Sequence, residues 1–93
     1  MDVREAARTA KDYIIEIFAD EQITNVGLEE VVFEDMSNNW KITIGFSRPW
    51  DYKKTLLAAL GDASSVRSYK VVNIDDESGR VRSVKHRTLI DAD

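Results

Sequence analysis

The chain is poor in several residue types that carry chemistry or constrain the backbone. Among its 93 residues it has no cysteine, one histidine, one proline and four glycines. Without cysteine, disulfides, thiolate metal sites and thiol nucleophiles are excluded. This composition suits a reducing compartment, and we expect a cytoplasmic location.

Long apolar runs are missing as well, and a membrane-spanning helix needs about 20 consecutive apolar residues. A secretory signal needs a basic start followed by an apolar run, and here Asp2 and Glu5 interrupt the start. We therefore expect a soluble protein that does not use a membrane as a partner.

What the chain does contain is typical of a globular protein, with 43% hydrophobic and 32% charged residues. Its length predicts one domain covering residues 1–93. The net charge is −4 and is uneven: residues 1–47 carry ten acids and four bases, whereas 48–93 carry seven acids and nine bases. The acidic balance disfavours nucleic acid as a partner, because phosphate binding relies on clustered Lys and Arg.

The segment 3–19 is predicted to form an amphipathic helix. Its apolar side chains recur at three- and four-residue spacing, as Ala6, Ala10, Tyr13, Ile14, Ile17 and Phe18. Asp2 is placed to cap the first turn, and Glu5 follows three residues later, as in a capping box with Asp in place of Ser or Thr. The apolar stripe is expected to pack on a sheet.

Four strands are predicted, at 26–35, 40–47, 66–75 and 80–87. The second has strict period-two alternation, with its apolar side chains at Trp40, Ile42, Ile44 and Phe46. Gly45, on the other face, leaves room for a close neighbour. The first strand changes the parity of its apolar residues at Glu29-Glu30, which requires a bulge or a sheet covered on both faces.

The connection 48–65 is predicted to leave the sheet. Pro49 ends strand pairing, because it lacks an N–H and pushes Arg48 out of the helical region. After it, Asp51 is a possible helix N-cap and Gly61 a possible stop. The whole order predicts an α+β fold: an N-terminal helix packed on a four-stranded antiparallel meander sheet, with a short helical insertion between strands 2 and 3.

The last hairpin, YKVVNIDDESGRVRSVK, resembles the end of PepSY-type domains, which run strand, Asp-x-x-(Thr/Ser)-Gly, strand. Asp75 or Asp76, together with Ser78 and Gly79, occupies the matching positions, and the insertion departs from that pattern. The helix-plus-four-strand plan also resembles cystatin-like folds and small bacterial proteins. These resemblances imply a binding or inhibitory module and supply no catalytic residue.

Three groups of residues were weighed as sites of catalysis or metal binding. His86, the single histidine, is a potential general base, but no Ser or Thr of the chain lies in a nucleophile motif such as G-x-S-x-G. Asp75-Asp76-Glu77 offers oxygen ligands for a hard cation, but without EF-hand spacing. Paired carboxylates are available at Glu29, Glu30, Glu34 and Asp35. In each case the favoured interpretation is an ordinary polar surface, so we expect no catalytic residue, metal or cofactor.

The basic strand 80–87 has two interpretations. Its cations, Arg80, Arg82, Lys85 and Arg87, can bind nucleic acid or an acidic partner, or they can pair with the acidic outer face of the first strand. They alternate between the two faces of the strand, which spreads the charge, and no aromatic stacking motif accompanies them. Pairing within the protein is the favoured interpretation.

Arg48, Trp50 and Tyr52 are the predicted partner-binding residues. They stand together on a connection, and Arg, Trp and Tyr are enriched at interface hot spots. The competing interpretation is that Trp50 plugs the end of the core.

These observations predict a non-catalytic protein-interaction module. It would bind a protein partner or form a homodimer through the outer sheet face and residues 48–60, and an inhibitor or immunity-type role is a subtype. The alternative is a small-molecule binder or minor enzyme, with a pocket between helix and sheet near Trp40, Phe46 and Trp50.

Overall fold

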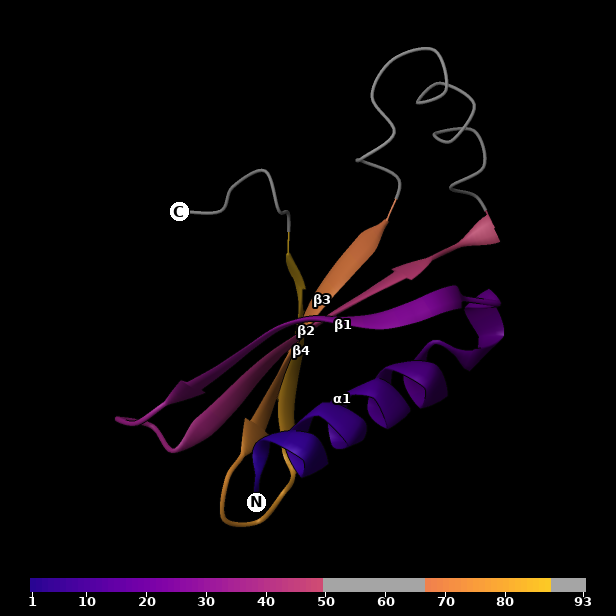
Figure 1. Cartoon of the computed structure of the whole chain (residues 1–93). Helices are drawn as coiled ribbons and strands as arrows, with labels where there is room; N and C mark the ends of the chain where they lie inside the picture. The colour runs from indigo at the N-terminus through magenta and orange to yellow at the C-terminus, as the bar shows by residue number, and fades with distance from the viewer. Residues whose placement is uncertain (50–66, 88–93) are drawn as a thin grey trace, which may run out of the picture.

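A computed structural model describes residues 1–49 and 67–87, which form one helix, a short 3-10 turn and four strands. The elements are α1 (Val3–Ile17), the 3-10 turn η1 (Ala19–Glu21), β1 (Thr24–Glu34), β2 (Asn39–Ser47), β3 (Ser68–Asp75) and β4 (Val81–Arg87). The strands form one antiparallel sheet in the order β1-β2-β3-β4, and α1 lies along one face of it (Figure 1).

The predicted α+β fold, a helix packed on a four-stranded antiparallel meander, is therefore confirmed. The predicted insertion lies, apart from residues 48 and 49, outside the described residues. Element bounds shift by a few positions: α1 ends at Ile17, and η1 fills the segment before β1, which begins at Thr24. No helix in the described part of the chain is long and apolar enough to cross a membrane.

The N-terminus of α1 is fixed by the predicted capping box. The Asp2 side chain accepts a hydrogen bond of 2.8 Å from the Glu5 backbone N–H, and the Glu5 carboxylate accepts one from the Asp2 backbone N–H. The terminal amine of Met1 also lies 3.7 Å from the Asp76 carboxylate in the β3–β4 turn. The helix start is thus attached to the same end of the sheet as that turn (Figure 1).

The core lies between α1 and the sheet. Its fully buried side chains are Ala6, Ala10, Ile14, Ile42, Ile44, Phe46, Val72 and Ile74. The stripe prediction was partly wrong, because Tyr13 and Ile17 are 37% and 44% exposed. Because a helix turns by about 100° per residue, Tyr13 lies at the edge of the apolar stripe. Ile17 is the last residue of the helix.

Of the two alternatives predicted for the parity change in β1, the structure has the bulge. The register of β1 with β2 shifts between Leu28 and Glu30, so Leu28 is opposite Ile44 while Glu30 is opposite Thr43. The extra residue, Glu29, moves the carboxylate of Glu30 onto the face of the sheet that points away from α1. A second register shift lies between Thr24 and Gly27, at the start of the same strand.

Two turns use the residues that tolerate positive φ. Gly79 in the β3–β4 turn has φ 71°, as its position in the sequence predicts, and Asn38 in the β1–β2 turn has φ 53°. The two turns meet, because the Asp76 backbone N–H donates to the Asn38 carbonyl at 2.9 Å.

Replacing Ile14 by Ala should lower the free energy of unfolding by about 2–5 kcal/mol, because it leaves a cavity in the core under α1. Ile15, the next residue, is 49% exposed, and its replacement by Ala should change stability by less than about 1 kcal/mol. Urea denaturation of both variants measures the difference. Equal losses would contradict this placement of the helix.

Candidate functional site: the outer face of the sheet

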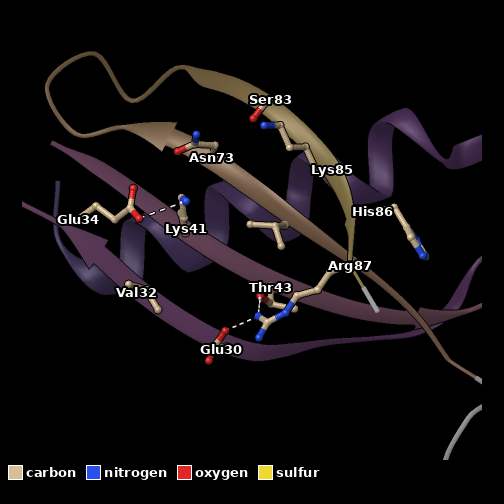
Figure 2. A pocket seen from close by; sticks show the side chains of 11 residues that line it. Glu30, Val32, Glu34, Lys41, Thr43, Asn73, Ser83, Lys85, His86 and Arg87 are labelled. Atoms are coloured by element: carbon tan, nitrogen blue, oxygen red, sulfur yellow. Dashed lines mark hydrogen bonds and ion pairs between the residues drawn. The ribbon is translucent and has the colours of Figure 1, made fainter. Parts of the chain in front are cut away.

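The candidate site lies on the outer face, by which we mean the face of the sheet opposite α1. A hollow of about 430 Å³ opens there. It is lined by side chains from all four strands: Glu30, Val32 and Glu34 of β1, Lys41 and Thr43 of β2, Val71 and Asn73 of β3, and Ser83, Lys85, His86 and Arg87 of β4 (Figure 2). The period of two along each strand places most of these residues on one face.

One end of the hollow is closed by Arg87. Its guanidinium reaches from β4 to pair with the Glu30 carboxylate of β1, and it donates to the Thr43 hydroxyl at 2.8 Å (Figure 2). Thr43 is only 2% exposed although its side chain points away from the helix. The arginine and glutamate therefore cover the middle of β2 on the side that α1 does not reach.

Gly45 permits a second crossing at the same end. An added Cβ would lie 2.7 Å from Glu29 Oε2, 2.9 Å from Arg67 Nη2 and 3.0 Å from the Tyr69 ring. Arg67 and Glu29 form an ion pair of 3.3 Å in that space. The prediction that Gly45 leaves room for a close neighbour is confirmed, and the neighbours are this ion pair and the tyrosine ring.

The other end of the hollow is bordered by further ion pairs and hydrogen bonds. Lys41 Nζ lies 3.1 Å from Glu34, and Arg82 donates to Asn39 Oδ1 at 3.0 Å and lies 3.9 Å from Asp75. The basic strand was expected to pair with the acidic residues of β1, and Arg87 does so through Glu30. Arg82 pairs instead with a residue of β3.

Three polar groups in the hollow are left over from this network: the Lys85 ammonium, the Ser83 hydroxyl and the Asn73 side-chain amide. Within residues 1–49 and 67–87, Lys85 has no ion-pair partner. The Asn73 Oδ1 atom is buried and accepts no hydrogen bond from the residues that the structure describes. A buried acceptor without a donor costs free energy. The atom itself has almost no exposed surface, so among these groups the exposed Lys85 side chain is the one open to a ligand.

Sequence reasoning did not identify this group of residues. Asn73 interrupts the apolar run VVNI, which was the available signal. Lys85 was weighed only as one charge of a basic strand. Ser83 became relevant only once the register placed it directly opposite Asn73.

His86 gives little support to acid–base chemistry in the hollow. It is opposite Lys70 in the register and therefore belongs to the parity of the helix-facing residues. Its ring is exposed and points away from the other labelled side chains (Figure 2).

The carboxylates of the β3–β4 turn are occupied by donors of the protein itself. Asp75 accepts from the Ser78 backbone N–H at 2.8 Å and from the Ser78 hydroxyl at 2.9 Å, and these hydrogen bonds lower the pKa of Asp75. Asp76 accepts from the Trp40 indole N–H at 2.8 Å. Among the described residues, no group of three or more His, Cys, Asp or Glu side chains is arranged to hold a metal ion.

Of the predicted partner-binding residues, only Arg48 lies within the described residues; Trp50 and Tyr52 lie outside them. The Arg48 side chain is 17% exposed and pairs with Glu21 at 3.0 Å. Its guanidinium lies 5.3 Å and 5.1 Å from the ring centroids of Phe18 and Phe46, within cation–π range. Burial, followed by the charge of Arg48, lowers the pKa of nearby Lys70.

Replacing Ser78 by Ala should raise the pKa of Asp75 toward its ordinary value of about 3.9, because the hydroxyl no longer donates to the carboxylate. A carboxylate with a lowered pKa stabilises the folded state above its unfolded-state pKa, and this stability is lost as the pH falls through the folded-state value. The variant should therefore lose less stability on acidification. NMR titration of the carboxyl carbon and urea denaturation at several pH values measure both effects. Ser37→Ala, in the other turn, is the control, and an unchanged Asp75 pKa in Ser78→Ala would contradict the assignment.

Replacing Arg48 by Ala should lower the free energy of unfolding by about 1–2 kcal/mol, because both cation–π contacts and the Glu21 pair are lost. The pKa of Lys70 should rise in the same variant, since a neighbouring positive charge is removed. Arg8→Ala, at an exposed position of α1, is the control. Unchanged stability with lost partner binding would instead favour the role predicted for Arg48 from the sequence.

Comparison with known proteins identifies no relative from which a function could be transferred. No protein-family model matches the chain, and no curated protein and no solved structure is significantly similar to it. The geometry of the outer face is therefore the basis on which a function can be proposed.

Proposed function

We propose that the protein is a non-catalytic interaction module that binds another protein through the outer face of its sheet. The observation that carries this proposal is the hollow itself. It spans all four strands, ion pairs border it at both ends, and between them it offers Lys85, Ser83 and Asn73 without partners among the described residues.

The composition of the hollow favours a protein partner. Val32 and Val71 supply apolar surface, and cations, acids and neutral polar groups surround them. Protein interfaces combine apolar contact with polar groups in this way. The ion pairs that border the hollow hold many of its walls in place, which lowers the entropy that a partner must remove on binding.

The positions of the titratable groups favour binding over acid–base catalysis. Lys70 and Asp75, whose pKa values are lowered, both lie outside the hollow. The resemblance to PepSY-type and cystatin-like domains remains a prediction, and it too implies a binding or inhibitory module. An inhibitory or immunity-type role is one form that this function can take.

A small-molecule binder is the second candidate, supported by the volume of the hollow. About 430 Å³ falls within the usual range of roughly 300–1,000 Å³ for ligand pockets. The predicted location of such a pocket, near Trp40, Phe46 and Trp50, receives less support. Phe46 is fully buried in the core there, and the Trp40 indole N–H is engaged by Asp76.

Self-association is a third possibility, and pairing of two β1 edges is its obvious route. The regular part of β1 carries Glu30 and Glu34. An antiparallel pairing centred on Val32 would place Glu30 of one copy opposite Glu34 of the other, and like charges directly opposite each other destabilise a sheet. This favours a different protein as the partner over a second copy.

Blocking the hollow should abolish partner binding while leaving the fold intact. Ser83→Arg places a long side chain in the hollow, and Gln22→Arg introduces the same side chain at an exposed position between η1 and β1, outside the hollow. Immobilised wild type and both variants are incubated with lysate of the native cell, and retained proteins are quantified by mass spectrometry.

We expect a protein that is retained by the wild type and by Gln22→Arg but is reduced at least about tenfold with Ser83→Arg. Circular dichroism and urea denaturation establish that both variants fold. Equal retention by all three proteins, or retention by none of them above bare resin, would contradict the proposal.

A further inference from the structure

We infer that the edge of β1 accepts an extended, basic segment of another protein as a fifth strand of the sheet. The segment pairs with residues 30–34, turns apolar side chains toward α1 and places Lys or Arg beside the acids of the edge. This inference goes beyond the proposed function, because it concerns the edge of the sheet and not the hollow.

The first step concerns the backbone of β1. Within the described residues β1 pairs with β2 alone, so it is an edge strand. Its two register shifts lie between Thr24 and Glu30, and residues 30–34 pair with β2 without interruption. Along such an edge, alternate backbone N–H and C=O groups point away from the sheet. Residues 30–34 therefore offer a regular row of groups that an added strand can bond.

The second step concerns apolar side chains at this edge. Of the eight large hydrophobic side chains that are exposed in the described part of the chain, four belong to β1 or directly follow it: Leu28, Val32, Phe33 and Met36. Leu28 is opposite Ile44 and Phe33 is opposite Trp40, so both lie on the helix-facing side of the sheet. The other edge strand, β4, carries none of the eight. The apolar layer under α1 therefore ends on β1 at side chains that a further strand would cover.

An exposed side of α1 faces the same edge. α1 packs against β1, β2 and β3 (Figure 1). Phe18, just after the helix, lies beside Lys70 of β3, so this side of α1 points toward β3. At about 100° per residue, Tyr13 and Ile17 lie on the opposite side of Ile14 and therefore point toward β1. Both are exposed, and they would contact the apolar side chains of an added strand.

The third step concerns charge. Residues 12–40 include eight acids and no Lys, Arg or His. Cations from outside this segment pair with four of the acids: Glu21, Glu29, Glu30 and Glu34. The other four form no ion pair with the residues that the structure describes: Asp12, Glu16, Asp20 and Asp35. This surplus of negative charge attracts a basic segment and repels an acidic one.

The register predicts where the cations of the added strand lie. Glu30 and Glu34 are 49% and 42% exposed although each is already paired, and a carboxylate has about four lone-pair sites, so each can accept a second cation. A strand opposite residues 30–34 places its first and fifth residues beside these two acids. Its second and fourth residues lie beside Val31 and Phe33 on the helix-facing side. The edge therefore selects the pattern Lys-apolar-x-apolar-Lys, with Arg as the equivalent of Lys.

The competing explanation is that the acids only protect the edge from pairing with other chains, as charges at sheet edges do. That role accounts for the acids. It does not account for Leu28, Phe33 and Met36, which leave apolar surface exposed at the same edge. The two explanations differ in what happens when a basic strand is added.

The basic strand β4 of a second copy fits the edge less well than a strand of another protein. Its outward cations, Lys85 and Arg87, are two residues apart, whereas Glu30 and Glu34 are four apart. Only one of the two cations can therefore lie opposite a glutamate. Arg87 is also already paired with Glu30 of its own chain.

The test uses the full chain labelled with ¹⁵N and three peptides: acetyl-Lys-Val-Thr-Val-Lys-amide, a counterpart with Glu in place of both Lys, and a counterpart with Ser in place of both Val. The Lys-Val peptide should shift the amide signals of residues 30–34 in a saturable way. The Glu peptide, which has the wrong charge, and the Ser peptide, which lacks the apolar side chains, should bind at least about tenfold more weakly.

Hydrogen exchange tests whether the peptide pairs with the backbone. In the chain alone, the amides of residues 30–34 that point to the edge should exchange faster than those bonded to β2. At a peptide concentration ten times its Kd, these edge amides should exchange about tenfold more slowly.

Two variants and one control complete the test. Phe33→Ala removes apolar surface at the edge and should weaken the Lys-Val peptide about fivefold. Asp35→Lys reverses an exposed charge and should weaken the Lys-Val peptide while strengthening the Glu peptide. Ile15→Ala truncates an exposed side chain on the Phe18 side of α1 and should leave peptide binding unchanged. Circular dichroism establishes that each variant folds.

Four results would overturn the inference: no saturable shift with the Lys-Val peptide, equal affinity for the Glu or the Ser peptide, unslowed exchange of the edge amides in the complex, or unchanged peptide preference in Asp35→Lys. Sedimentation of the chain alone as a dimer whose edge amides are already protected would assign the edge to a second copy and overturn it as well.

The inference and the proposed function can fail separately. Any of these results, combined with a cellular partner that Ser83→Arg no longer retains, overturns the edge site and leaves the proposed function standing. Peptide binding as expected, combined with partner retention that Ser83→Arg does not affect, overturns the proposed function instead.

Discussion

The structure depends on covering β2 on both faces. β2 lies inside the sheet, and five consecutive residues from Ile42 to Phe46 are buried. α1 is the single α-helix of the described residues, and it covers one face, where its alanines and Ile14 meet Ile42, Ile44 and Phe46. The other face of β2 is covered by charged side chains that reach across the sheet, Arg87 with Glu30 over Thr43 and Arg67 with Glu29 over Gly45.

The difference between the two faces, one covered by a helix and the other by long charged side chains, explains where a binding surface arises. A helix packed on a sheet leaves a closed core, whereas long side chains that cross the outer face leave space between them. The hollow is the space between these crossing side chains. The Arg87 and Lys41 ion pairs border it, and Val71 and Asn73 of β3 lie at its base. The side chains that hold the fold together on this face therefore also shape the surface proposed to meet a partner, and they give it its mixture of charge and polarity.

Local sequence patterns were enough to predict most of the fold, but they predicted little of the candidate site. The alternation in 40–47, the capping box at Asp2 and Glu5 and the glycine at Gly79 act through neighbours in the sequence, and each produced the expected element. The site depends on contacts between residues that are distant in the sequence, such as Arg87 and Glu30, which are 57 residues apart. Strand order, the bulge and the register together determine which of several acidic residues an arginine contacts. The parity change in β1 predicted either a bulge or a sheet covered on both faces, and the structure has the bulge. Composition alone did not indicate that Asn73 would lie half-buried between Lys41 and Ser83.

The most direct test of this account is a double-mutant cycle on the crossing of the outer face. Arg87→Met, Glu30→Gln and the double variant are compared with the wild type by urea denaturation at low and high salt. The account predicts a coupling energy of about 0.5–1 kcal/mol that shrinks as salt increases, because part of the pair is exposed to solvent. Additive effects within about 0.3 kcal/mol at both salt concentrations would contradict the claim that this pair helps to hold the outer face together.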